Sequence, residues 1–358
     1  MDPIRPPLPR NLISVPIVGA PLAGGPSTPA LAAAVSEAGG LGFLAGGYRP
    51  ARSLAGDIQS MRALTGRPFG VNLFFPVREQ IDEAAVTGYR DRLAGEAGRH
   101  GVVPGEPRWT DDDWQAKLDL VGRERPAVIS FTFGCPGREI VHELKAGGSS
   151  VWCTVTSPAE AALAASAGID ALVLQGGEAG GHQGAFHDHS DDPLPLLTLL
   201  QLVRRATALP LVAAGGVATS QGIAAVLAAG ASAAQLGTAL LLTPEAGTSQ
   251  PHREALRGRR PTRLTRAFTG RRARGIVNRF MLEHEDDAPS AYPEIHHVTA
   301  PIRAAARERG DAETINLWAG QSYPLAEEAP AFELVERLAH GLPKSGRHPV
   351  GRPRWPSG

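Results

Sequence analysis

Short, continuously apolar segments recur along this chain, and most of them are followed by a segment with helical spacing. The apolar segments cover residues 13–20, 41–45, 68–75, 127–133, 150–155, 171–175, 211–214 and 233–236, and helical patterns cover residues 30–38, 51–64, 137–145, 157–167, 194–207 and 220–229. A run that is apolar at every position is typical of a strand buried on both faces in a parallel sheet. Eight such strands in succession predict an α/β protein of the (β/α)8 barrel type.

An open Rossmann-like sheet is the alternative fold, but no G-x-G-x-x-G motif follows the first strand. Two segments interrupt the barrel pattern. Residues 78–125 are predicted to form a long charged helix and a polar loop containing Trp109 and Trp114, as a smaller insertion between the third and fourth strands. The domains that we predict are a barrel at 1–244 and 314–345, a substrate-binding cap at 245–313 after the eighth strand, and a flexible tail at 346–358. Insertions on this side of a barrel commonly cover the active site.

The charge and cysteine content exclude several classes of function. The 36 Lys and Arg residues balance the 36 Asp and Glu residues, so the chain has no overall attraction to nucleic acids or acidic membranes. Cys135 and Cys153 are the only cysteines, which excludes a disulfide framework and a cysteine-based zinc cluster. No signal-peptide pattern opens the chain, and the uncharged residues 223–244 fit a helix, turn and strand better than a membrane span. We expect a cytoplasmic protein that binds neither nucleic acid nor membrane.

Function in a (β/α)8 barrel is found at the carboxyl ends of the strands. Two of these ends pair small residues, Gly215-Gly216 after the seventh strand and Gly237-Thr238 after the eighth, and a helix begins nearby at Ser220. Backbone N–H groups there can approach a phosphate without obstruction by side chains. The sequence therefore predicts a phosphate site, and we assign the phosphate to a cofactor rather than to a substrate.

Two other strand ends carry the amide side chains of Asn72 and Gln175, which can both donate and accept hydrogen bonds, as the edge of a flavin ring requires. The loop that begins at Gln175 reads QGGEAGGHQG over residues 175–184. His182 lies among glycines that offer it little packing, so its imidazole is predicted to face a cavity. Because imidazole has an ordinary pKa suited to proton transfer near neutral pH, we predict a catalytic role for His182 in preference to a structural one.

The chain resembles the nitronate monooxygenases, formerly called 2-nitropropane dioxygenases, over nearly its whole length. The segments that carry the resemblance are GAPLAGGPSTPALAAAVSEAGGLGFLAGGY at 19–48, RPFGVNLFFP at 67–76, SFTFGCP at 130–136, LVLQGGEAGGHQG at 172–184, AAGGVA at 213–218, AAQLGTALLLTPEA at 233–246, TRAFTGRRARGIVNRF at 265–280 and LWAGQSY at 317–323. The correspondence is weaker in residues 78–125 and after residue 325. The QGxEAGGHxG motif is shared with flavin-dependent enoyl-acyl-carrier-protein reductases, so it defines the superfamily better than the substrate.

This resemblance implies an FMN-dependent TIM barrel. The residues that it implies bind FMN are Ala20, Pro21, Asn72, Gln175 and Gly180, with Gly215, Gly216, Gln235, Gly237 and Thr238 at the phosphate end. His182 stands where the family has its catalytic base. Trp318, Gln321, Ser322 and Tyr323 are expected near the mouth, with Ser322 and Tyr323 in the substrate pocket, which Tyr323 would narrow. No metal ion is expected.

The activity that the resemblance implies is oxidation of an alkyl nitronate by O2 to a carbonyl compound and nitrite, with neutral nitroalkanes as a further substrate class. An NAD(P)H-dependent flavin reductase of the enoyl-acyl-carrier-protein reductase type is the closest alternative. A flavin-binding protein without turnover is a third interpretation, and the exposed His182 argues against it because a binding protein needs no base there. The sequence is compatible with a homodimer.

Three further features have simpler interpretations. The loop at residues 187–192, HDHSDD, is predicted to be solvated rather than a metal site, since it lacks cysteines and a helical histidine spacing. The nine arginines within residues 253–274 are predicted to form a cap surface neutralised by the acidic residues 283–287. His296-His297 is assigned to structural hydrogen bonding.

Overall fold

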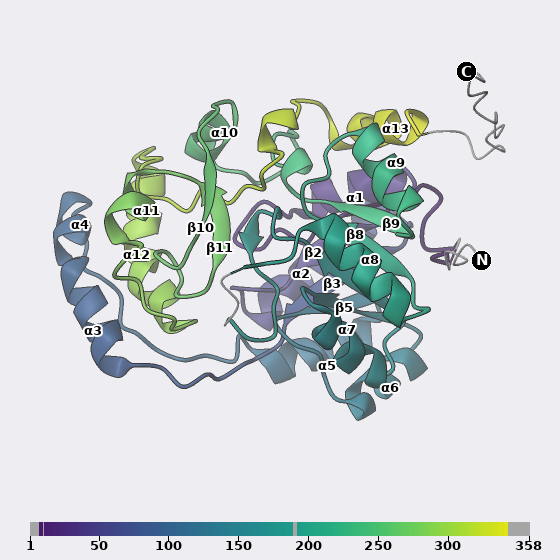
Figure 1. The fold of residues 1–358 in the computed structure, drawn as a ribbon, viewed down its shortest axis with the longest axis horizontal. Coiled ribbons are helices and arrows are strands. Elements are labelled where there is room, and N and C mark those ends of the chain that lie inside the picture. The colour runs from purple at the N-terminus through teal and green to yellow at the C-terminus, as the bar shows by residue number, and fades with distance from the viewer. Residues whose placement is uncertain (1–6, 10, 189–191, 343–358) are drawn as a thin grey trace, which may run out of the picture.

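The computed structural model describes residues 7–9, 11–188 and 192–342 (Figure 1). Its main sheet has the strand order β1-β9-β8-β6-β5-β4-β3-β2, every pairing is parallel, and a parallel bridge between Val18 and Leu41 joins β1 to the start of β2. The strands are β1 (Ile17–Gly19), β2 (Gly42–Ala45), β3 (Phe69–Phe74), β4 (Val128–Thr132), β5 (Ser150–Val155), β6 (Ala171–Gln175), β8 (Leu211–Ala214) and β9 (Ala233–Leu236). The predicted (β/α)8 barrel is confirmed. The tail predicted at 346–358 lies outside the described residues.

Helices cover the outside of the barrel. They are α1 (Pro29–Glu37), α2 (Ala51–Leu64), α5 (Trp114–Glu124), α6 (Arg138–Ala146), α7 (Pro158–Ser166), α8 (Leu196–Ala206), α9 (Ser220–Ala228) and α13 (Ala331–His340). Two of them begin at a side-chain cap, because Thr28 Oγ1 accepts from Leu31 N at 3.0 Å and Ser157 Oγ accepts from Glu160 N at 3.2 Å. Helix α13 packs against α1 and completes the ring of helices.

Alternate strand residues face two separate cores. One core lies between the strands and the helices and includes Leu44, Leu73 and Leu174. The other includes Phe43 and Trp152, whose ring centroids are 5.9 Å apart, and the N-terminal residues Leu8 and Leu12 also belong to it. Because both faces of every strand are covered, the strands are apolar at consecutive positions, as the sequence predicts.

The segment between β3 and β4 differs from the prediction. It contains three helices, α3 (Glu83–Arg92), α4 (Ala94–Arg99) and α5, in place of one long helix and a loop. Trp114 is the first residue of α5, and its ring packs edge-on against Phe75 with the centroids 5.3 Å apart. The assignment of Trp114 to a loop is therefore wrong, because its ring packs against the barrel core.

The segment predicted to form the cap, residues 245–313, is called the cap below. It contains α10 (Gln250–Leu256), β10 (Thr262–Thr265), β11 (Ala273–Ile276), α11 (Arg279–His284) and α12 (Glu294–Glu308). Strand β11 pairs antiparallel with β10 and also with the short β7 (Gly181–His182) from the loop after β6, so a three-stranded sheet links cap and barrel. Figure 1 shows α3 and α4 beside the cap helices α11 and α12, on the side away from the barrel. There Val86 and Tyr89 share an apolar core with Phe268 and Phe280.

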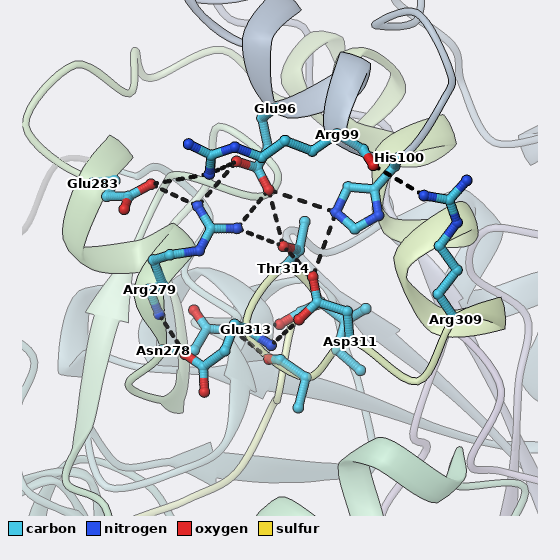
Figure 2. A network of polar contacts seen from close by, with 12 residues as sticks. Glu96, Arg99, His100, Asn278, Arg279, Glu283, Arg309, Asp311, Glu313 and Thr314 are labelled. Atoms are coloured by element: carbon cyan, nitrogen blue, oxygen red, sulfur yellow. Dashed lines mark hydrogen bonds and ion pairs between the residues drawn. The ribbon is translucent and has the colours of Figure 1, made fainter.

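A polar network also joins α4 to the cap (Figure 2). The carboxylate of Glu96, whose side chain is 3% exposed, accepts from Arg279 Nη2 at 2.6 Å, from Arg279 Nη1 at 2.9 Å and from Thr314 Oγ1 at 2.9 Å. Burial raises the pKa of Glu96, but the hydrogen bonds from Arg279 and Thr314 outweigh burial and bring the pKa to about 2. The insertion is thus attached to the cap by a charged pair as well as by apolar packing.

The predicted neutralisation of the arginines at 253–274 by residues 283–287 is wrong for the four of them that form ion pairs among the described residues. Arg257 pairs with Glu328 and Arg260 with Glu313. Arg266 Nε and Arg272 Nε instead lie 2.9 and 3.0 Å from the carboxylate of Asp188, in the chain that follows β7. The pairing of β7 with β11 brings Asp188 to the cap, and this long-range contact has no local signal in the sequence.

The uncharged residues 223–244 form the end of α9, β9 and the 3-10 helix η1 (Thr238–Leu240), as predicted. Within the described part of the chain, no helix combines the length and the apolar character needed to cross a membrane.

Candidate active site

A cavity of about 440 Å³ lies at the carboxyl ends of the barrel strands, between the barrel and the cap. It is lined by all the residues predicted to bind the cofactor, namely Ala20, Pro21, Asn72, Gln175, Gly180, Gly215, Gly216, Gln235, Gly237 and Thr238. His182 and Ser322 line the same cavity. Closure of the barrel brings these residues together, because they follow strands that are far apart in the sequence.

Tyr323 is the predicted site residue that the structure places elsewhere. Its side chain is 2% exposed, packs with Leu241 and Leu317, and donates a hydrogen bond of 2.7 Å from its hydroxyl to the carbonyl oxygen of Arg260. The residue begins the 3-10 helix η2 (Tyr323–Leu325), outside the lining of the cavity. The assignment of Tyr323 to the substrate pocket is therefore wrong: burial of the ring and a partner for its hydroxyl hold it in the core.

The backbone at the end of β8 has a conformation that suits an anion. Gly215 and Gly216 have φ angles of +113° and +68°, a left-handed conformation in which successive backbone N–H groups can converge on one anion. Across the cavity lining, Gly180 approaches the chain so closely that a β-carbon there would lie 2.4 Å from Gly320 N. A β-carbon at Gly180 would therefore displace one of these two backbone segments, whereas Gly215 and Gly216 favour glycine because of their positive φ angles.

Asn72 and Gln175 use part of their hydrogen-bonding capacity within the protein. Asn72 Nδ2 donates to Ser130 Oγ at 2.9 Å and Thr132 Oγ1 at 3.0 Å, which leaves its carbonyl oxygen for a ligand. Gln175 Nε2 donates to His182 O at 3.0 Å, and its second N–H remains available. The chemistry of this donor and acceptor set fits the edge of a flavin ring.

His182 reaches the cavity from the short strand β7, paired with Ala273 of the cap. Its Nε2 lies 2.9 Å from Thr269 Oγ1. The aromatic rings of Phe133, Tyr292 and Trp318 surround the imidazole, with centroids 5.9, 5.7 and 5.6 Å from its own. The histidine that the sequence singles out is therefore held at the junction of barrel and cap.

The surroundings of His182 keep its imidazole neutral. Burial and the positive charges of Arg271 and Arg303 lower the pKa of His182 to about 3. The Arg271 guanidinium lies over the Phe133 ring, 4.2 Å from its centroid, and Arg303 Nε donates to Thr299 Oγ1 at 3.0 Å. Two buried cations beside a neutral base create a positive potential that favours an anionic substrate.

Several lining residues carry little or no signal in the sequence. Tyr48 follows a predicted strand and Phe133 is the last residue of another, so their position alone could have identified them. His252 and Arg307 come from the cap and depend on the tertiary structure. The Tyr48 ring stacks on His296, with centroids 4.3 Å apart and planes 5° from parallel. Tyr48 and Phe133 also line a second cavity of about 310 Å³, so they form a wall between the two spaces.

One group of possible metal ligands was found among the described residues. Oxygen and nitrogen atoms of Glu96, Glu283 and His284 lie within 4.8 Å of one another, and the guanidinium of Arg279 binds both carboxylates there. Asp188, in the loop predicted to be solvated, binds Arg266 as described above, and residues 189–191 of that loop lie outside the described residues.

The comparisons with known proteins agree with this geometry. The sequence profile of the nitronate monooxygenase family matches residues 7–341. A nitronate monooxygenase of Pseudomonas aeruginosa is 41% identical over 344 residues, which cover 92% of this chain and 97% of the relative.

Solved structures show the same likeness. A nitroalkane oxidase from Streptomyces ansochromogenes superposes with a TM-score of 0.90 at 51% identity, over 93% of this chain and 96% of that one. FabK from Thermotoga maritima is a more distant likeness, with a TM-score of 0.72 at 28% identity over 92% and 94% of the two chains. The chain is an oxidoreductase that belongs to the nitronate monooxygenase family.

Proposed function

We propose that this protein binds FMN and oxidises alkyl nitronates with O2, giving a carbonyl compound and nitrite. The observation that carries the proposal is a neutral His182, with two buried arginines nearby, in a cavity whose other walls are backbone amides and amide side chains. Membership of a family that is flavin-dependent in general supports the cofactor.

The residues that would hold FMN fall into two groups. Backbone groups around Gly215, Gly216, Gly237 and Thr238 would bind the phosphate, since a dianion is stabilised by converging N–H groups. Gln235 would lie at the same end of the cofactor. Asn72, Gln175 and Gly180, with Ala20 and Pro21, would contact the ring system. The flavin would supply the one-electron oxidation of the nitronate, which no amino-acid side chain in the cavity provides.

The protein's own side chains bind and orient the substrate. The positive potential from Arg271 and Arg303 would attract a nitronate, and the rings of Phe133, Tyr292 and Trp318 would exclude water from its alkyl group. Because the pKa of His182 is low, removal of a proton from a neutral nitroalkane is costly, which supports the preformed anion as the better substrate. Likeness to a nitroalkane oxidase supports nitroalkanes as a second substrate class.

The proposal is tested by anaerobic mixing of the purified flavoprotein with propionate 3-nitronate, and separately with NADPH and NADH. Bleaching of the flavin by the nitronate, with nitrite released when air is admitted, is the expected result. Rapid bleaching by a nicotinamide and none by the nitronate would instead favour a reductase, and a preparation without flavin absorbance would contradict the cofactor. A cytoplasmic location and a homodimer stay predictions from the sequence.

A further inference from the structure

The side chain of Thr269 contacts His182 from the cap. Thr269 is 1% exposed, and its backbone N–H donates to Arg266 O at 3.1 Å. Its hydroxyl oxygen lies 2.9 Å from His182 Nε2 and 3.1 Å from the carbonyl oxygen of Arg271. The contact with His182 has the length of an ordinary hydrogen bond, and the contact with Arg271 O is slightly longer than the usual O–H···O range.

The direction of these two hydrogen bonds follows from the number of hydrogens. A threonine hydroxyl has one hydrogen to donate, and a carbonyl oxygen can only accept. For both contacts to be hydrogen bonds, the hydrogen of the Thr269 hydroxyl has to point to Arg271 O. The contact with His182 then requires that the imidazole donates, so Nε2 carries the proton of the neutral ring.

The other ring nitrogen is thereby left without a proton. His182 lines the cavity, and among the described residues no hydrogen bond to Nδ1 was found. The backbone of His182 is fixed independently, because its carbonyl oxygen accepts from Gln175 Nε2 and its strand pairs with β11. The contact with Thr269 therefore affects which imidazole nitrogen of His182 carries the proton, and it is not needed to hold the His182 backbone in place.

We propose that Thr269 is a positioning residue that holds His182 as its Nε2–H tautomer and so presents an unprotonated Nδ1 to the substrate. With a neutral nitroalkane, the α-C–H bond breaks, the proton passes to Nδ1, and the electron pair moves onto the nitro group to give the nitronate. The imidazolium and the nitronate form an ion pair, and the hydrogen bond to Thr269 is retained throughout. This inference rests on the proposed function for its substrate, but not for the tautomer.

The tautomer is measured directly by ¹⁵N NMR of the holoenzyme labelled at histidine, with the His182 signals assigned by their loss in His182→Asn. A pyrrole-type Nε2 and a pyridine-type Nδ1 are expected in the wild type. The reverse assignment would overturn the proposal, whatever the enzyme oxidises. This experiment needs no Thr269 variant to fold.

Kinetics with two variants separate positioning from simple structural support. Thr269→Val keeps the shape of the side chain and removes the hydroxyl, whereas Thr269→Ser keeps the hydroxyl. We expect Thr269→Val to lower kcat/KM for a neutral nitroalkane by about 10- to 100-fold, and for the preformed nitronate by less than about 3-fold, with Thr269→Ser near the wild type. Flavin content should be equal in all three proteins.

Equal losses of Thr269→Val on both substrates, or no loss on the nitroalkane, would overturn the positioning role. Turnover of the nitronate without any turnover of nitroalkanes by the wild type would overturn the role of Nδ1 as a base while leaving the proposed function intact. Absence of activity on both substrates would instead contradict the proposed function, and the NMR assignment would still decide the tautomer.

Discussion

The side-chain amide of Gln175 closes the loop that carries His182: its Nε2 donates to the His182 carbonyl oxygen at 3.0 Å, and its Oε1 accepts from Gly184 N at 2.6 Å. A residue predicted to contact the cofactor therefore also fixes the position of the predicted base. The two roles are compatible because an amide group has four hydrogen-bonding positions, and these contacts use two.

Replacing Gln175 by leucine should loosen this loop. Gln175→Leu leaves the two backbone groups of the loop without partners, at a cost of roughly 1–3 kcal/mol per buried group. We expect lower thermal stability and a lower kcat with a nitronate, measured by thermal unfolding and nitrite release. The control is Gln201→Leu, because Gln201 is exposed on α8 and its side chain bonds only to Leu197 O among the described residues. Equal behaviour of the two variants would contradict the role given to Gln175.

A methyl group at Gly180 should reduce cofactor binding. In Gly180→Ala the new β-carbon would lie 2.4 Å from Gly320 N, so one of the two backbone segments that line the cavity must move. We expect less FMN per protein, measured by absorbance and by titration of the apoprotein. Gly88→Ala in α3 is the control, since no atom lies within 4 Å of its added carbon and a helical alanine is more stable by about 0.5–1 kcal/mol. Full FMN content in Gly180→Ala would argue against a role of the close contact between Gly180 and Gly320 in cofactor binding.

The pair of Glu96 and Arg279 should contribute more to stability than an exposed ion pair. Removing one partner of a buried pair costs roughly 3–5 kcal/mol, and because Arg279 is 30% exposed, we expect Glu96→Gln to fall near the lower end of that range. The control is Glu327→Gln, whose partner Arg337 and own side chain are 49% and 61% exposed, with an expected cost below about 1 kcal/mol. Urea unfolding measures the free energy of unfolding of both variants. Equal losses in Glu96→Gln and Glu327→Gln would contradict the greater contribution of the buried pair.

Stability should fall in mild acid because buried histidines resist protonation. Burial is the main cause that lowers the pKa of His182 to about 3 and those of His252 and His297 to about 4. Between an unfolded pKa of about 6.5 and these native values, the unfolded chain binds more protons, so the free energy of unfolding decreases as the pH falls.

The pH dependence is measured by urea unfolding at pH 7.5, 6 and 5. His252→Asn, which removes one titrating group, should flatten the decrease. Glu96 affects the stability at lower pH, because the stabilisation from its ionised carboxylate is lost only as the pH falls from about 4.5 towards 2. A free energy of unfolding that is constant from pH 7.5 to pH 5 would show that the buried histidines do not control acid stability.

The barrel and the residues predicted to bind the cofactor at its cavity could be foreseen from the sequence and its family resemblance. Consecutive apolar positions in β3 or β6 can be satisfied only by burial on both faces, and glycines at 215 and 216 indicate a backbone conformation that other residues avoid. These requirements depend on residues that are close together in the chain, so the sequence alone indicates them. The spacing of residues did not specify a reaction. The oxidation of nitronates was inferred from the resemblance of the loop around His182 to one flavin-dependent family.

The tertiary structure decided what depends on contacts between distant segments. The sequence does not indicate that β7 pairs with β11, that Thr269 reaches His182, or that Asp188 binds Arg266. Tyr323 shows the same limit, because its place in the core instead of the substrate pocket depends on a hydroxyl partner 63 positions away, Arg260. Such contacts are selected by packing and by the need to satisfy buried polar groups, which only the folded chain defines.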